Sequence, residues 1–72
     1  MISTQQIKIK LAEAIKQSGL TQAEIARRTG VKQPQICCYV KGTKMPSLDT
    51  LANMCVALDL DANEILCVTE NR

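Results

Sequence analysis

The fold is decided by the stretch from Thr21 to Gly42, TQAEIARRTGVKQPQICCYVKG. Its two halves predict short helices over residues 22–29 and 33–41, joined by a turn of about three residues around Gly30. Gly30 permits a left-handed turn, and the small side chain of Ala26 lets the two helices cross closely. The apolar contacts that fix the crossing angle are expected from Ile25, Val31, Ile36 and Tyr39.

Helix start signals continue on both sides of this stretch. Three have the pattern of a capping box, in which a side chain and the one three positions later satisfy each other's backbone N–H groups. They are Ser3-x-x-Gln6, Thr21-x-x-Glu24 and Asp61-x-x-Glu64. Ser47 after Pro46 predicts a fourth start, and Pro34 fits the first turn of a helix because the N–H it lacks would have no partner there.

Stop signals and apolar spacing complete the pattern. Gly19, Gly30 and Gly42 can each adopt the left-handed conformation that ends a helix. Apolar residues recur at three- and four-residue steps in the first and fourth helices: Ile7, Leu11, Ala14, Ile15, and Leu48, Leu51, Ala52, Cys55, Leu58. Five helices are predicted, over about 4–18, 22–29, 33–41, 48–58 and 62–67.

Length and composition agree with an all-α fold. A chain of 72 residues has room for one domain, which we assign to residues 1–72. It is 46% hydrophobic and 22% charged, an ordinary globular composition. Its aromatics amount to one Tyr, so the β-branched and aromatic strands of a small β-sandwich are missing.

Several function classes are disfavoured by residue content. The chain has no His, the commonest general base and metal ligand, so we expect no enzyme and no cofactor. Cys37, Cys38, Cys55 and Cys67 do not have zinc-site spacing and are interpreted as thiols without a metal or disulfide. Neither a membrane span nor a secretion signal is evident, which favours a cytoplasmic protein.

Charge is distributed unevenly along the chain. Up to Lys44 the chain has eight lysines and arginines and two acidic residues, Glu13 and Glu24. After Lys44 it has one basic residue, Arg72, and five acidic residues. The basic part favours a polyanionic partner such as nucleic acid. The alternative is a solvated surface that happens to be polarised.

At this point the chain resembles the phage repressor and Cro family of helix-turn-helix domains. The resemblance is carried by Leu20–Thr21–Gln22, Ile25–Ala26, Gly30–Val31, Ile36, Tyr39, Lys41–Gly42, Pro46–Ser47–Leu48, Leu51, Ala57–Leu58 and Ile65–Leu66. It implies a compact five-helix bundle, the lambda-repressor-like DNA-binding domain, which binds operator DNA as a dimer. Double-stranded DNA is therefore the expected partner.

The resemblance also implies roles for single residues. Lys32, Gln33, Pro34, Cys37 and Cys38 match positions that face base edges, and the Gln33 amide suits adenine best. Gln22 matches a phosphate contact at a helix start, and further phosphate contacts are expected from Gln35, Tyr39, Lys41 and Lys44. The alternative is that Tyr39 is a packing residue and that the two lysines are solvated loop charges.

Two positions depart from the family pattern. Family members often pair an Arg near the end of the first helix with a Glu near the end of the recognition helix, and Ile15 and Val40 stand there instead. We expect these two side chains to touch, because apolar packing can replace a buried ion pair only if both charged residues are lost at the same time. Thr29 occupies a usually aliphatic position, where Val31 is expected to supply the missing contact.

The acidic C-terminal segment 60–68 is the expected dimer surface. It would be repelled by phosphate, yet it carries more apolar residues than one short helix can bury. With Ile65 and Leu66 assigned to the core, the interface contacts are expected to be Leu60, Cys67 and Val68. The alternative is that this tail folds back on its own domain or frays.

The sequence thus predicts a homodimeric, sequence-specific transcriptional regulator, most simply a repressor. No small-molecule ligand and no membrane contact are expected. Two other functions remain open. One is an antitoxin or accessory factor that also binds a protein, and the other is a helical interaction module that does not bind DNA.

Overall fold

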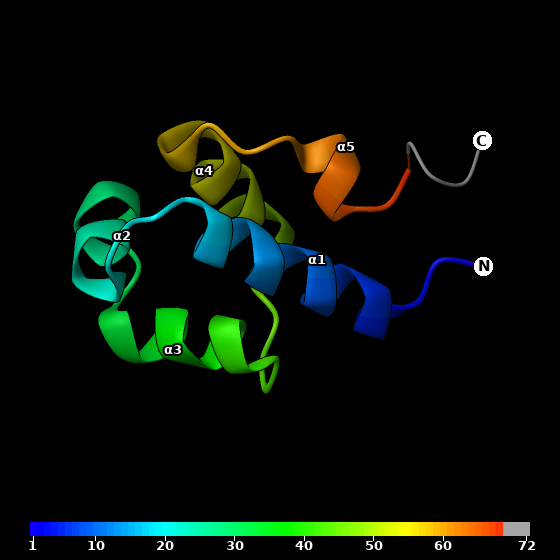
Figure 1. Cartoon of the computed structure of the whole chain (residues 1–72), viewed down its shortest axis with the longest axis horizontal. Coiled ribbons are helices and arrows are strands. Elements are labelled where there is room, and N and C mark those ends of the chain that lie inside the picture. Colours follow the sequence, from blue (N-terminus) through cyan, green and yellow to red (C-terminus); the bar gives the residue numbers. More distant parts are fainter. Residues whose placement is uncertain (69–72) are drawn as a thin grey trace.

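The computed structural model describes residues 1–68, which form five α-helices and no strand (Figure 1). The helices are α1 (Thr4–Gln17), α2 (Gln22–Thr29), α3 (Gln33–Lys41), α4 (Leu48–Leu58) and α5 (Ala62–Ile65). The predicted all-helical fold is confirmed. The C-terminal ends of two helices differ from the prediction, since α1 ends at Gln17 rather than at residue 18 and α5 ends at Ile65 rather than at residue 67.

The predicted capping box of α1 forms in full. The Gln6 backbone N–H donates to the Ser3 hydroxyl over 3.2 Å, and the Ser3 N–H donates to the Gln6 side-chain oxygen over 2.8 Å. Two N–H groups that a helix start leaves without a partner are therefore satisfied.

The other helix starts are capped differently from prediction. The Thr21 hydroxyl accepts from the Glu24 N–H, but the Glu24 side chain turns to two arginines instead of returning the bond. At α5 the Asp61 carboxylate accepts from the Asn63 N–H. Ser47 precedes α4 as predicted, yet its hydroxyl is hydrogen-bonded to the side chains of Asp49 and Thr50 and makes no capping bond.

The end of α5 corrects the prediction for Cys67. The Cys67 N–H donates to the Glu64 carbonyl and the Val68 N–H to the Asn63 carbonyl, the paired bonds that close a helix with a left-handed residue. Cys67 supplies that conformation with a φ of 63°, although glycine usually does so. This turn places the Cys67 side chain inside its own chain, where it is 1% exposed.

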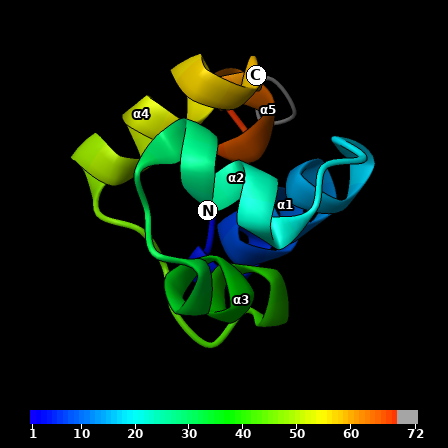
Figure 2. The same cartoon turned by 90° about the vertical axis from the view of Figure 1, so that its left-hand side faces the viewer.

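The helices enclose one apolar core. α1 packs against α3 and α5, while α2 packs against α3 and α4. The buried cluster takes residues from every helix: Leu11, Ile15, Ile25, Ile36, Tyr39, Leu51, Met54, Cys55, Leu58 and Ile65. Figures 1 and 2 show α3 on the opposite side of the molecule from α4 and α5. No helix within residues 1–68 has the length and apolar composition to cross a bilayer.

Hydrogen bonds hold the turn between α2 and α3. Gly30 ends α2 in the left-handed conformation, with a φ of 75°. The buried hydroxyl of Thr29 donates to the Ile25 carbonyl over 2.8 Å and accepts from the Val31 N–H over 3.2 Å. From α4, the Asn53 amide donates to the Thr29 carbonyl over 2.7 Å. Thr29 therefore fixes the turn by hydrogen bonds, while Val31 packs beside the core as predicted.

Candidate nucleic-acid interface

α3 has one buried side and one open side. Ile36 and Tyr39 face the core and are 0% and 6% exposed. At the start of α3, Gln33, Pro34 and Gln35 are exposed, as is Lys32 in the N-cap position. Pro34 lies in the first turn, as predicted, where it displaces no helical hydrogen bond. The first turn of α3 is therefore open to a large partner.

The five residues predicted to face base edges come together on this open side. Residues four apart on a helix share a face, so Cys37 follows Gln33 and Cys38 follows Pro34 in two adjacent rows. Both cysteines are half-buried, whereas Gln33 and Pro34 are exposed. The geometry thus presents a short ridge on which Lys32, Gln33 and Pro34 are exposed and the two cysteines are half-buried.

The side chains on this ridge differ in what they can recognise. The Gln33 amide offers two N–H donors and a carbonyl acceptor, and the Lys32 ammonium offers donors only. Pro34 is apolar, and the thiols of Cys37 and Cys38 are weak hydrogen-bonding groups that behave as small apolar ones. On this surface Gln33 is therefore the side chain best equipped for a two-bond contact with one base.

The residues predicted to contact phosphate lie around the ridge, with one exception. Gln22 is the first residue of α2, and Figure 1 places the starts of α2 and α3 at the same end of the molecule. Lys41 ends α3, Lys44 lies in the following loop, and both are exposed. Tyr39 is the exception, because its ring packs in the core and leaves little of the side chain for a phosphate.

Two arginines on α2 are tied to a carboxylate. Arg27 Nε and Arg28 Nε each donate to a Glu24 carboxylate oxygen over 2.9 Å. Both hydrogen bonds lower the pKa of Glu24, the one from Arg27 more strongly than the one from Arg28, and bring it to about 2. The Glu24 carboxylate is therefore ionised throughout the neutral range. The charge of α2 is therefore partly neutralised, which leaves Lys32, Lys41 and Lys44 as the exposed cations at the two ends of α3.

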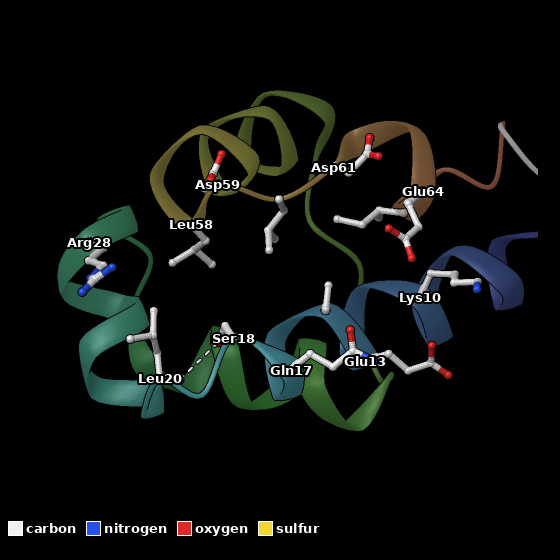
Figure 3. Close-up of a pocket in the computed structure, with 13 residues that line it drawn as sticks. Lys10, Glu13, Gln17, Ser18, Leu20, Arg28, Leu58, Asp59, Asp61 and Glu64 are labelled. Atoms are coloured by element: carbon white, nitrogen blue, oxygen red, sulfur yellow. Dashed lines mark hydrogen bonds between the residues drawn. The ribbon is translucent and has the colours of Figure 1, made fainter.

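The acidic part of the sequence lies elsewhere. Asp59, Asp61 and Glu64 line a cavity of about 360 Å³ between α1, α2 and the segment that leads into α5 (Figure 3). Lys10 and Arg28 also line it. Residues of α1, α2, the end of α4 and the segment into α5 line this groove, and no residue of α3 does. The charge asymmetry along the sequence is therefore also an asymmetry in space.

Sequence reasoning missed one residue that shapes this surface. Asn53 of α4 holds the C-terminal carbonyl of α2 through a contact between residues 24 positions apart. No local pattern marks an exposed Asn in a helix as the partner of a distant carbonyl. Cys55 lies on the buried side of α4, as its apolar spacing predicts, and burial, with a smaller effect of Asp61, raises the pKa of its thiol.

Comparison with known families gives one match. The family model described as helix-turn-helix matches residues 11–65, which include the two helices and the turn. Comparisons with curated proteins and with solved structures found no match. Because the family model covers most of the chain and α2 and α3 meet at the turn it describes, the chain belongs to the repressor/Cro-type helix-turn-helix family of DNA-binding transcriptional regulators.

Proposed function

We propose that this protein is a sequence-specific repressor of the Cro type that binds a two-fold symmetric operator as a homodimer. The observation that carries the proposal is the open first turn of α3, where Lys32 and Gln33 project from a helix whose opposite side is locked into the core. In this function the start of α3 enters the major groove. Two copies would place two such helices in successive grooves about 34 Å apart.

In this proposal the contacts divide into two groups. Gln33 reads adenine through its amide, Lys32 reaches a guanine or a phosphate, and Pro34 with the two thiols touches a thymine methyl group. Gln22, Gln35, Lys41 and Lys44 contact phosphates and set the position of α3 on the duplex. Apolar readers such as Cys37 and Cys38 leave part of the discrimination to DNA shape.

The function is tested by selecting bound sequences from a random DNA pool and measuring their affinity at several salt concentrations. We expect one enriched sequence with two-fold symmetry, and an affinity that falls with salt as counterions are released. Failure to enrich any sequence, together with no salt-dependent binding, would contradict the proposal and favour a helical interaction module.

Gln33→Ala is expected to weaken binding to the selected operator by ~1–3 kcal/mol and to relax preference at one base pair. The reason is that alanine loses both hydrogen bonds of the amide. Gln5→Ala, at an exposed position on α1, is the matched control and should bind as wild type does. Unchanged affinity and unchanged base preference in the Gln33 variant would show that Gln33 does not contact a base.

Lys41→Ala and Lys44→Ala are expected to weaken binding to all sequences alike. If each ammonium meets a phosphate, the slope of log affinity against log salt should flatten by about one unit per substitution. Lys10→Ala is the control, because it removes the same charge beside the acidic groove. A slope unchanged by the loop substitutions would identify Lys41 and Lys44 as solvated charges.

The three residues predicted to form the dimer interface differ in availability. Val68 is 44% exposed, and Leu60 is half-buried against the core. Cys67 is buried in its own chain, so the prediction that it contacts a second subunit is withdrawn. Of the segment proposed for dimerisation, Val68 alone offers a substantial apolar surface within residues 60–68.

A further inference from the structure

A second groove lies between α1 and the C-terminal end of α3. Its volume is about 270 Å³, and its lining includes Lys8, Ala12 and Lys16 of α1 together with Val40 and Lys41 of α3. The two helices pack against each other, so their side chains form its walls. We call it the lysine groove, to distinguish it from the acidic groove that Asp59, Asp61 and Glu64 line.

The α1 wall of the lysine groove is one row of three residues. Lys8, Ala12 and Lys16 are four apart, so they share a face of the helix. At 1.5 Å per residue the two lysines are spaced ~12 Å apart along the helix axis, and in this row only the methyl group of Ala12 lies between them. Lys8 is half-buried and Lys16 is exposed. An extended strand can therefore lie along the row and meet a cation near each end.

The charge of the lysine groove is left unbalanced by the protein. Its lining contains three lysines, Lys8, Lys16 and Lys41, and one carboxylate, that of Glu13. Within residues 1–68 none of these three lysines forms an ion pair. Lys10 of the same helix lines the acidic groove instead. A groove with three unpaired cations attracts an anion that carries several charges.

The lysine groove continues the ridge at the start of α3. Lys41 lies four residues after Cys37 and eight after Gln33, so it extends the same row along the helix. Lys41 also lines the lysine groove, where α1 begins on the other side. A duplex that meets Gln33 at one end of this row and Lys41 at the other therefore brings its backbone to the edge of the groove.

We propose that the lysine groove binds the sugar-phosphate backbone of the same DNA, so that the interface extends from α3 onto α1. The inference rests on the proposed function and deepens it, because it adds Lys8 and Lys16 to the phosphate contacts. Each ammonium binds a phosphate of one strand as a point charge. The half-buried Ala12 and Val40 give the sugar between these phosphates an uncharged surface. Such contacts set the position of the duplex and carry no base preference.

Salt dependence tests these contacts. Lys8→Ala and Lys16→Ala should each weaken binding to the selected operator and flatten the slope of log affinity against log salt by about one unit. Base preference should stay that of wild type. Lys16→Arg keeps the charge and should keep the slope. Lys10→Ala, which removes the same charge from the acidic-groove side of α1, is the matched control and should leave the slope unchanged. Thermal melts check that the variants fold.

Neutral phosphates locate the contacts on the DNA. A methylphosphonate in place of one phosphate removes its charge, and the replacement can be moved along each strand of the operator. Wild type should lose affinity at phosphates that the lysines meet. Lys16→Ala should no longer respond at one of them, because the ammonium and the phosphate act as a pair. Lys8→Ala should lose its response at a different phosphate of the same strand.

Two results would overturn the inference. One is a wild-type salt slope in both Lys8→Ala and Lys16→Ala, and the other is a pattern of methylphosphonate sensitivity that neither substitution changes. Either would leave the lysine groove to another anion, such as an acidic protein segment.

Failure of this inference differs from failure of the proposed function. If Gln33→Ala weakens binding while Lys8→Ala and Lys16→Ala match wild type, α3 reads DNA and the contact on α1 is refuted. If wild type shows no salt-dependent binding to any duplex, the proposed function fails and the inference fails with it.

Discussion

Ile15→Arg is expected to lower the free energy of unfolding by ~3–5 kcal/mol, because it buries a cation that has no partner. Ile15 is 3% exposed in α1 and belongs to the core cluster. Members of the family often have an arginine here that pairs with a glutamate on the recognition helix. Chemical denaturation of the wild type and the variant measures the loss.

The double variant Ile15→Arg with Val40→Glu should recover much of this stability. α1 packs against α3, and Val40 packs against the cluster that contains Ile15. If the two side chains touch, the introduced charges can pair, and a double-mutant cycle will show a coupling energy. Strict additivity of the two single changes would contradict the predicted contact.

Thr29→Val is expected to cost ~1–3 kcal/mol of stability, although an aliphatic residue is usual at this position in the family. The hydroxyl accepts the Val31 N–H and donates to the Ile25 carbonyl, and valine fills the same space without either bond. Thr4→Val, at an exposed position in the first turn of α1, is the matched control and should change stability little.

Asn53→Ala should destabilise the same turn from the other side by ~1 kcal/mol, because the Thr29 carbonyl loses its side-chain partner. Since both substitutions act on one turn, their effects should not be additive. A stabilising Thr29→Val variant would mean that apolar packing, rather than hydrogen bonding, holds the turn between α2 and α3.

Local chemistry explains why the helices could be predicted. The Ser3 and Gln6 pair and the glycines at 30 and 42 act within a few residues, so their effect is visible in the sequence. The capping prediction at Thr21 was only half right, because Glu24 bonds Arg27 and Arg28 instead of the N-cap N–H. Arg27 and Arg28 lie one turn after Glu24 and form charged hydrogen bonds with its carboxylate. The capping-box pattern takes no account of such neighbours.

Tertiary placement explains what could not be predicted. Apolar periodicity put Leu48 and Ala52 with the inward residues of α4, but steps of three and four also fit the outer side, where both are exposed. Cys67 adopts a left-handed conformation that nothing local announces in a residue other than glycine. Exposure of Leu48 and Ala52 and burial of Cys67 depend on how the helices pack together, which no local pattern encodes.

The positions at which this protein meets DNA can be measured directly by titrating isotope-labelled protein with a half-site duplex taken from the selected operator and recording amide chemical shifts. We expect the largest changes at Gln22, over residues 32–38 and over residues 41–44, with little change in α5. Large changes along α5 and the acidic groove, with α3 unmoved, would contradict the claim that the open side of α3 reads DNA.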